Sequence, residues 1–275
     1  MSHRRFIGMS AVAVAVLCAP AVAIGIASTA SAATTPAMTP MLSPALSTTV
    51  APGGNFDLSR WELQLPIGSP GSPTTISPTQ LAGSKGFQDK YFFTNTTDGS
   101  MSFWDPENGV KTPNSNFARS ELREMNADGT PAAWLAPGTH TLSATLKSTL
   151  IPDHVAVGQI HLGENSGSTK PLLELFYFKN GNVDMAIEQT PAGGNEVHHV
   201  VGNVPLGTKF SYVIGLNATT ISLNLNGTTH TWPLPSSFHG FTMYFKAGDY
   251  DQSSGSSSTV GAKVQFYALT FKHTA

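Results

Sequence analysis

The chain has 275 residues, of which only 12% are charged, and 15 Lys and Arg stand against 17 Asp and Glu. A net charge of -2 argues against a protein built to bind nucleic acid or a membrane surface, because such proteins carry a strong basic excess. A single cysteine excludes an intramolecular disulfide, and 26 glycines with 19 prolines favour turns and short strands over long helices.

The first 54 residues differ in composition from the rest of the chain. Residues 1–32 have a basic start, an apolar run from about Met9 to Ala27 and a small-residue cleavage site at Ala30–Ala32, which together predict a secretory signal peptide. Residues 33–54 are rich in Thr, Pro and Ala, carry no charge and predict a disordered spacer. We therefore expect a secreted, extracellular protein with no membrane attachment in its mature form and one folded domain over residues 55–275.

Alternating apolar and polar residues within this domain predict many short strands. The first is Trp61–Leu65, followed by a loop over 69–73 and a short helix or turn over 79–82. Further strands are expected at 91–94, 100–104, 119–124, 140–150, 155–162, 172–179, 183–189, 198–202, 210–216, 220–225, 228–233, 242–247 and 264–272. Asn-Gly pairs at 180–181 and 226–227 predict hairpins. No convincing amphipathic helix or internal repeat is present, so the fold class predicted is all-β, a jelly roll formed by two antiparallel sheets.

The stretch Arg119–Met125 places four charges in seven residues. As a strand, it puts Arg119, Glu121 and Arg123 on one face. A guanidinium fork binds carboxylates with paired hydrogen bonds, so this face suits an anionic ligand. A solvated edge strand with a local ion pair explains the stretch equally well, and other segments must decide.

Two more segments show the same arrangement. In 155–162, alternation puts Val155, Val157, Gln159 and His161 on one face, away from Ile160 and Leu162. In 244–252, it puts Tyr244, Lys246, Gly248 and Tyr250 on one face, away from Phe245 and Ala247. Gly248 within a strand indicates a bulge or a close approach by a ligand. Each face alone is also compatible with an ordinary exposed or half-buried strand.

Neighbouring strands of one sheet would gather these faces into a polar, cationic groove, which suits an extracellular anionic polysaccharide. Glycoside hydrolysis normally needs two carboxylates, and the groove offers only Glu121. β-Elimination from a uronate fits better, because neutralising the carboxylate stabilises the developing enolate by about 3–4 kcal/mol per well-placed donor. His161 and Tyr250 supply a base and an acid without a metal or cofactor.

Arg-Ser-Glu-Leu-Arg at 119–123, Gln-Ile-His at 159–161 and Tyr-Phe-Lys-Ala-Gly-x-Tyr-x-Gln at 244–252 resemble, in this order, the three motif strands of the alginate lyases of polysaccharide lyase family seven. The resemblance covers Phe56 to the C-terminus. It implies a jelly roll whose concave sheet binds alginate and cleaves its 4-O-glycosidic bonds by endo-type β-elimination.

The resemblance also implies roles for individual residues. Arg119 and Gln159 would neutralise the carboxylate, His161 would be the base, and Tyr250 would be the acid or, for mannuronate, both acid and base. The remaining substrate-binding or groove-shaping residues would be Glu121, Arg123, Tyr244, Lys246 and Gln252. Within the family, Ile160 is associated with acceptance of guluronate-containing blocks.

One departure from the family pattern is the pair Asp249 and Asp251, which adds negative charge beside Tyr250. Two alternatives stay open: a non-catalytic carbohydrate-binding module on the same sandwich, and a lyase of another polyuronate. In each case we expect a monomer that binds an anionic polysaccharide and no nucleic acid.

Overall fold

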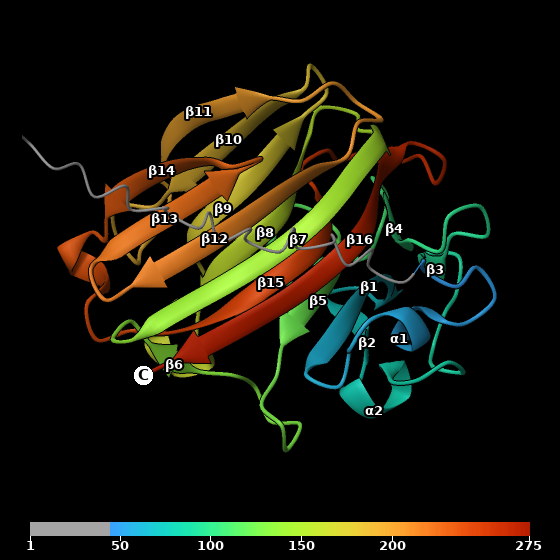
Figure 1. The fold of residues 1–275 in the computed structure, drawn as a ribbon, viewed down its shortest axis with the longest axis horizontal. Coiled ribbons are helices and arrows are strands. Elements are labelled where there is room, and N and C mark those ends of the chain that lie inside the picture. The colour runs from blue at the N-terminus through green and yellow to red at the C-terminus, as the bar shows by residue number, and fades with distance from the viewer. Residues whose placement is uncertain (1–44) are drawn as a thin grey trace, which may run out of the picture. The chain divides into compact units, whose positions relative to one another are not determined.

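The computed structural model describes residues 45–275, so the predicted signal peptide and the first twelve residues of the predicted spacer lie outside the described residues. Two antiparallel sheets face each other, as the sequence predicts (Figure 1). The strands of the larger sheet are β1 (Trp61–Ser69), β2 (Ser72–Ile76), β5 (Ser120–Glu124), β6 (Trp134–Leu135), β8 (His154–Leu162), β9 (Pro171–Phe178), β10 (Asn182–Ile187), β11 (Val197–Asn203) and β15 (Thr242–Asp251). Those of the smaller sheet are β3 (Phe92–Thr94), β4 (Met101–Pro106), β7 (Thr139–Leu150), β12 (Phe210–Asn217), β13 (Thr220–Leu225), β14 (Thr228–Pro233) and β16 (Gly261–Thr274).

The order of strands in the nine-stranded sheet is β11-β10-β9-β8-β15-β5-β1-β2, and β6 pairs with β15 outside this path. The seven-stranded sheet runs β14-β13-β12-β7-β16-β4-β3, with the long strands β7 and β16 side by side in Figure 1. The strands β8, β15 and β5 are thus neighbours, although their residues lie far apart in the chain. This adjacency brings the three predicted faces together.

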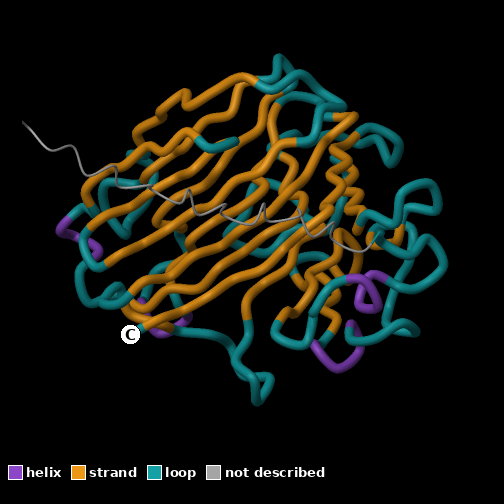
Figure 2. The backbone as a smooth tube through the Cα atoms, in the orientation of Figure 1, coloured by secondary structure: helices purple, strands orange, loops and turns teal. Residues whose placement is uncertain are grey.

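In the part of the chain that the structure describes, helical structure is limited to short turns, shown in purple in Figure 2: α1 (Pro52–Asn55), α2 (Pro78–Leu81), η1 (Glu164–Ser166) and η2 (Ser236–Phe238). The predicted helix or turn at 79–82 corresponds to α2. Within residues 45–275, no helix is both long enough and apolar enough to cross a bilayer.

The core lies between the two sheets and is built by strand alternation. In β7, every second residue is buried, including Leu142, Ala144 and Leu146. Aromatic rings from both sheets meet there: Tyr177 of β9 contacts Phe210 of β12 edge-on, with ring centroids 5.0 Å apart. Each large side chain buried in this way stabilises the fold by about 1.5–3 kcal/mol.

Residues 45–54 belong to the domain rather than to the spacer in which we placed them. Leu46 packs against the core, and Ala51 is buried and donates its backbone N–H to the Ser84 carbonyl at 3.0 Å. The Asn55 side chain donates to the carbonyls of Ser47 and Gly99. A segment without charge or periodicity can still be ordered by contacts with distant residues, which composition does not reveal.

The predicted loop at 69–73 is in part a hairpin between β1 and β2. Gly71 takes the left-handed conformation (φ 76°) that the tight turn requires. Pro73 is tolerated in β2 because β2 is the edge strand of its sheet. At the predicted Asn-Gly turn between β13 and β14, Asn226 and Gly227 both have positive φ (50° and 92°), which confirms the hairpin.

The predicted shared face for Val155, Val157, Gln159 and His161 was wrong. Val155 and Val157 lie in the core together with Ile160 and Leu162, and the pairing of β8 with β9 shifts register between Ala156 and Gly158. A one-residue shift turns all following side chains to the other face. Gly158 sits at this bulge because a Cβ there would lie 2.5 Å from the Tyr212 hydroxyl.

The bulge expected at Gly248 is present. The register of β15 against β8 shifts between Ala247 and Tyr250, and Gly248 has a φ of 153°. A Cβ on Gly248 would lie 2.8 Å from the Cα of Glu121, so the glycine is needed for the close approach of β5. The close neighbour is therefore a strand of the same chain.

Candidate active site

A cavity of about 580 Å³ lies on the face of the nine-stranded sheet that points away from the core. Eight of the nine predicted site residues line it: Arg119, Arg123, Gln159, His161, Tyr244, Lys246, Tyr250 and Gln252. The ninth, Glu121, lies beneath the cavity and is fully buried. The structure thus brings together all nine predicted site residues.

The register of three strands sets these positions. In β15, Lys246 pairs with Arg123 of β5 on one side and with Gln159 of β8 on the other. Tyr244 pairs with His161 in the same way. Because facing residues of neighbouring strands have Cβ atoms about 5 Å apart, the polar side chains form a continuous layer.

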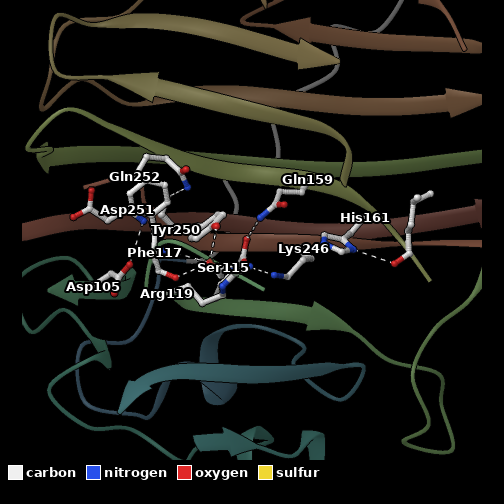
Figure 3. Close-up of polar contacts among 12 residues, drawn as sticks. Asp105, Ser115, Phe117, Arg119, Gln159, His161, Lys246, Tyr250, Asp251 and Gln252 are labelled. Carbon is white, nitrogen blue, oxygen red and sulfur yellow. Dashed lines mark hydrogen bonds and ion pairs between the residues drawn. The ribbon is translucent and has the colours of Figure 1, made fainter. Parts of the chain in front are cut away.

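The buried carboxylate of Glu121 organises this layer. Its neighbours Arg119, Gln159 and Lys246 are labelled in Figure 3. Arg119 donates from Nη1 to Glu121 Oε2 at 3.2 Å, Gln159 donates from Nε2 to Oε1, and the Lys246 ammonium contacts Oε2. Two cations share one carboxylate, so the cluster keeps a surplus positive charge. Burial and the nearby Arg119 lower the pKa of Lys246 to about 8, so this surplus weakens as the pH rises through that value.

Tyr250 is held by Arg119 and by a loop that precedes β5. The Arg119 guanidinium stacks on the phenol ring, 3.7 Å from its centroid. Ser115 directs its own proton to the Phe117 carbonyl at 2.8 Å. It therefore accepts hydrogen bonds from the Tyr250 hydroxyl at 2.9 Å and from Arg119 Nη2 at 3.1 Å. Burial raises the pKa of Tyr250, while Arg119 and Ser115 oppose this shift, so the phenol keeps its proton at neutral pH.

His161 is arranged as a neutral base. Its Nδ1 lies 3.0 Å from the Leu162 carbonyl oxygen. A carbonyl only accepts, so Nδ1 carries the proton and Nε2 carries the free lone pair. Burial, and then the charge of Lys246, lowers the pKa of His161 to about 3, which keeps the ring neutral at all ordinary pH values.

Several cavity residues were not identified from the sequence. Ser115 and Phe117 come from an irregular loop, and only their closeness to Arg119 in the chain hints at a role. Glu164 forms an ion pair with Arg123 at 2.7 Å. The far side of the cavity carries further carboxyl groups: Glu174, Glu188 and Glu196. Within residues 45–275, no group of three or more His, Cys, Asp or Glu side chains is placed to hold a metal ion.

The two aspartates beside Tyr250 do not line the cavity. Asp249 and Asp251 belong to β15 and are buried close to Asp105. Asp105 Oδ2 accepts the backbone N–H of Asp251 at 3.1 Å. Neither carboxyl oxygen of Asp249 has a hydrogen-bond partner within the described domain. Burial, followed by the charge of Asp105, raises the pKa of Asp249 well above its ordinary value.

We expect this aspartate cluster to make the fold less stable at alkaline pH. A carboxyl whose pKa is raised by folding contributes stability that is complete below its unfolded pKa and is lost as the pH rises through its folded pKa. The unfolding temperature should thus fall as the pH rises above the ordinary pKa of an aspartate, about 4, and Asp249→Asn should reduce that fall by about 2–4 °C per kcal/mol recovered. Thermal unfolding followed by circular dichroism measures both. Asp153→Asn, at an exposed carboxylate, is the control, and an Asp249→Asn curve parallel to that of the unmutated protein would contradict the assignment.

The comparisons with known proteins point to one family. The family model described as alginate lyase matches residues 56–273. An alginate lyase from Klebsiella pneumoniae is 29% identical over 284 residues, covering 82% of this chain and 92% of the relative. The crystal structure of an alginate lyase from Pseudomonas aeruginosa shares 35% identity, covers 79% of this chain and 100% of its own, and has a TM-score of 0.72.

A family 7 alginate lyase solved in complex with product is similar to the same extent. It has 34% identity and a TM-score of 0.72, and the match covers 82% of this chain and all of that one. The two-sheet sandwich is therefore the jelly roll of these enzymes, and the substrate class is a polysaccharide. The chain belongs to the alginate lyases of polysaccharide lyase family 7.

Proposed function

We propose that this alginate lyase is a secreted, endo-acting enzyme that cleaves by β-elimination in the cavity of the nine-stranded sheet. The observation that carries the proposal is the presence of three groups in one cavity. They are a cationic clamp formed by Arg119 and Gln159, the neutral imidazole of His161 with a free Nε2, and the protonated phenol of Tyr250. The expectation that the groove offers only Glu121 was wrong, because four further carboxyl groups line the cavity. Glu121 itself would not be one of the two carboxylates of a hydrolase, because it is buried and bound to cations.

The clamp would act on the carboxylate of the reacting uronate. Arg119 has five N–H donors, of which two are used by Glu121 and Ser115, and Gln159 uses one amide hydrogen on Glu121. The remaining Nη donors of Arg119 and the second amide hydrogen of Gln159 can bind the uronate carboxylate, whereas Arg119 Nε is buried. They stabilise the negative charge that develops on that carboxylate when the C5 proton leaves.

His161 and Tyr250 would then transfer protons. His161 Nε2 takes the proton from C5, and the electrons of that bond form the C4–C5 double bond. The C4–O4 bond breaks, and O4 takes the proton of the Tyr250 hydroxyl. In mannuronate, where C5 has the opposite configuration, Tyr250 would serve as both base and acid: its phenolate form would take the C5 proton and then pass a proton to O4. Solvent restores the proton states of both residues.

The shape of the cavity supports attack within a chain. Its lining extends from Gln64 on β1 across β5, β15, β8 and β9 to Glu196 beside β11, so it crosses much of the sheet. Arg123, Tyr244 and Gln252 line it around the proposed catalytic residues and would bind flanking sugars.

Acceptance of guluronate-containing blocks would be indirect. Ile160 is fully buried and faces the core, so its side chain does not reach the cavity. It lies between Gln159 and His161, and its packing sets their positions. We also propose that a signal peptide and a spacer precede the catalytic domain, and that the enzyme acts as a monomer.

Separate assays on polyguluronate, polymannuronate and glucuronan test this function. We expect ultraviolet absorbance from the new conjugated double bond with guluronate-containing substrate, and an early fall in polymer length measured by size-exclusion chromatography. Release of only the smallest product from the start would contradict the endo assignment. A response to glucuronan alone would point to another polyuronate.

A further inference from the structure

We propose that Glu174 is a further substrate-binding residue of this cavity, which recognises a uronate oxygen as a hydrogen-bond donor. The inference rests on the proposed use of the cavity as the alginate site. It concerns the acidic side of the cavity, opposite the cationic clamp.

The strand register places Glu174 directly beside the clamp. It lies in β9, where it pairs with Gln159 of β8. Leu173 and Leu175 point into the core, and Glu174 lines the same cavity as Arg119 and Tyr250. A substrate carboxylate bound by Gln159 would thus lie within one strand spacing of Glu174, about 5 Å.

The neighbouring carboxylates are already bound, and Glu174 is not. Glu121 is held by its cations, and Glu188 accepts the backbone N–H groups of Gly194 and Asn195 at 2.8 and 3.1 Å. Glu196 accepts from His198 at 3.1 Å. Among the described side chains, those of residues 45–164 and 166–275, none forms a hydrogen bond or ion pair with the Glu174 carboxyl. A half-buried carboxyl without a partner would be costly in its ionised form.

Charged groups on every neighbouring strand act on this carboxyl. Burial, together with the charges of Glu196 and Glu121, raises the pKa of Glu174 to about 8, against the opposing effect of Arg119 and Lys246. His161, from β8, is neutral and adds no charge. At neutral pH Glu174 therefore carries a proton, which makes it a donor toward a uronate carboxylate or hydroxyl.

The protonation state decides whether this side of the cavity attracts or repels alginate. Below about pH 8 the carboxyl donates a hydrogen bond; above it, the carboxylate lies against a polyanion. Binding should weaken as the pH rises through this value, so KM should rise. Lys246 loses its charge over the same range and would raise KM too, so a variant must separate the two groups.

Glu174→Gln separates them, because glutamine keeps a donor, cannot ionise and leaves Lys246 in place. At about pH 6.5 we expect its KM to stay within about twofold of the unmutated enzyme, since one neutral donor replaces another. Between about pH 6.5 and pH 9, the factor by which its KM rises should be about tenfold smaller than for the unmutated enzyme, because one close like charge has been removed. The kcat profiles should coincide. Glu174→Ala should raise KM at pH 6.5 by about 2- to 10-fold, the effect of one hydrogen bond.

Glu164→Gln is the matched control for loss of one negative charge, because Glu164 lines the same cavity but is exposed and paired with Arg123. The ratio of its KM to that of the unmutated enzyme should be the same at both pH values. Equal pH dependence of KM in Glu174→Gln and the unmutated enzyme would overturn the proposal, as would an unchanged KM for Glu174→Ala at pH 6.5.

Equilibrium binding keeps this test independent of the catalytic roles proposed for His161 and Tyr250. Binding of alginate oligosaccharide to Tyr250→Phe and to Tyr250→Phe with Glu174→Gln, measured by calorimetry at both pH values, should show the same difference in pH dependence. If the enzyme releases no unsaturated product, the proposed function fails, while these binding curves still support or refute the role of Glu174.

Discussion

Replacing Tyr250 with phenylalanine is expected to lower kcat on alginate by about 10²- to 10⁴-fold, the usual contribution of a positioned acid or base. The variant loses only the hydroxyl. The ring keeps its stacking on Arg119 and its edge contact with Phe117, whose centroid lies 6.3 Å away. We therefore expect KM and the unfolding temperature to change little, which steady-state kinetics and thermal unfolding will show.

Ser115→Ala is the matched control for Tyr250. It removes the hydrogen-bond partner of the phenol but leaves the phenol itself. The expected loss of kcat is about 2- to 10-fold, the effect of one hydrogen bond. Full activity in Tyr250→Phe would sink the acid assignment, and equal losses in the two variants would reduce Tyr250 to a residue that shapes the cavity.

Replacing Glu121 with glutamine is expected to destabilise the fold by about 3–5 kcal/mol, the typical cost of removing one partner of a buried ion pair. Arg119 and Lys246 would face each other without a counter-charge, at side-chain exposures of only 9% and 7%. For a domain of this size, the unfolding temperature should fall on the order of 10 °C. Activity should fall as well, because glutamine keeps only one of the two carboxylate oxygens, so either Gln159 or Arg119 loses the acceptor that orients it.

A second substitution tests the cause of this loss. Lys246→Met in the Glu121→Gln background removes one of the two unpaired cations, so the double variant should be more stable than Glu121→Gln alone. Denaturant unfolding of the two single variants and the double variant gives the coupling free energy. A single Glu121→Gln variant with an unchanged midpoint would show that the carboxylate does not hold the cluster together.

Strand positions could be predicted from the sequence because alternation is a local property. The hairpins at 180–181 and 226–227 depend on two residues each, and the motif strands have short repeating patterns. The face to which β8 turns Val155 and Val157 depends instead on the bulge at Gly158, which depends on the distant Tyr212 hydroxyl. A contact of that kind leaves no periodic signal.

The candidate site likewise contains residues that local sequence patterns predict and residues that depend on distant contacts. Arg119, Gln159, His161 and Tyr250 were predicted because they occur in motifs on strands, and the sheet brings those strands together. Ser115 contacts Tyr250 from a loop without periodicity, and Glu174 looks like any carboxylate on a strand until its neighbours are known. The buried position of Glu121, which alternation places with the cavity residues, follows from how closely β15 approaches β5 at Gly248.

The mass of the products tests the central claim, elimination at this site, most directly. Elimination adds no water, so the products formed from a defined alginate oligosaccharide should together have the mass of the starting chain, with one unsaturated end per cleavage. Mass spectrometry should find this balance for the unmutated enzyme and almost no product for Tyr250→Phe. Products that together gain one water per cleavage and lack the unsaturated chromophore would contradict it.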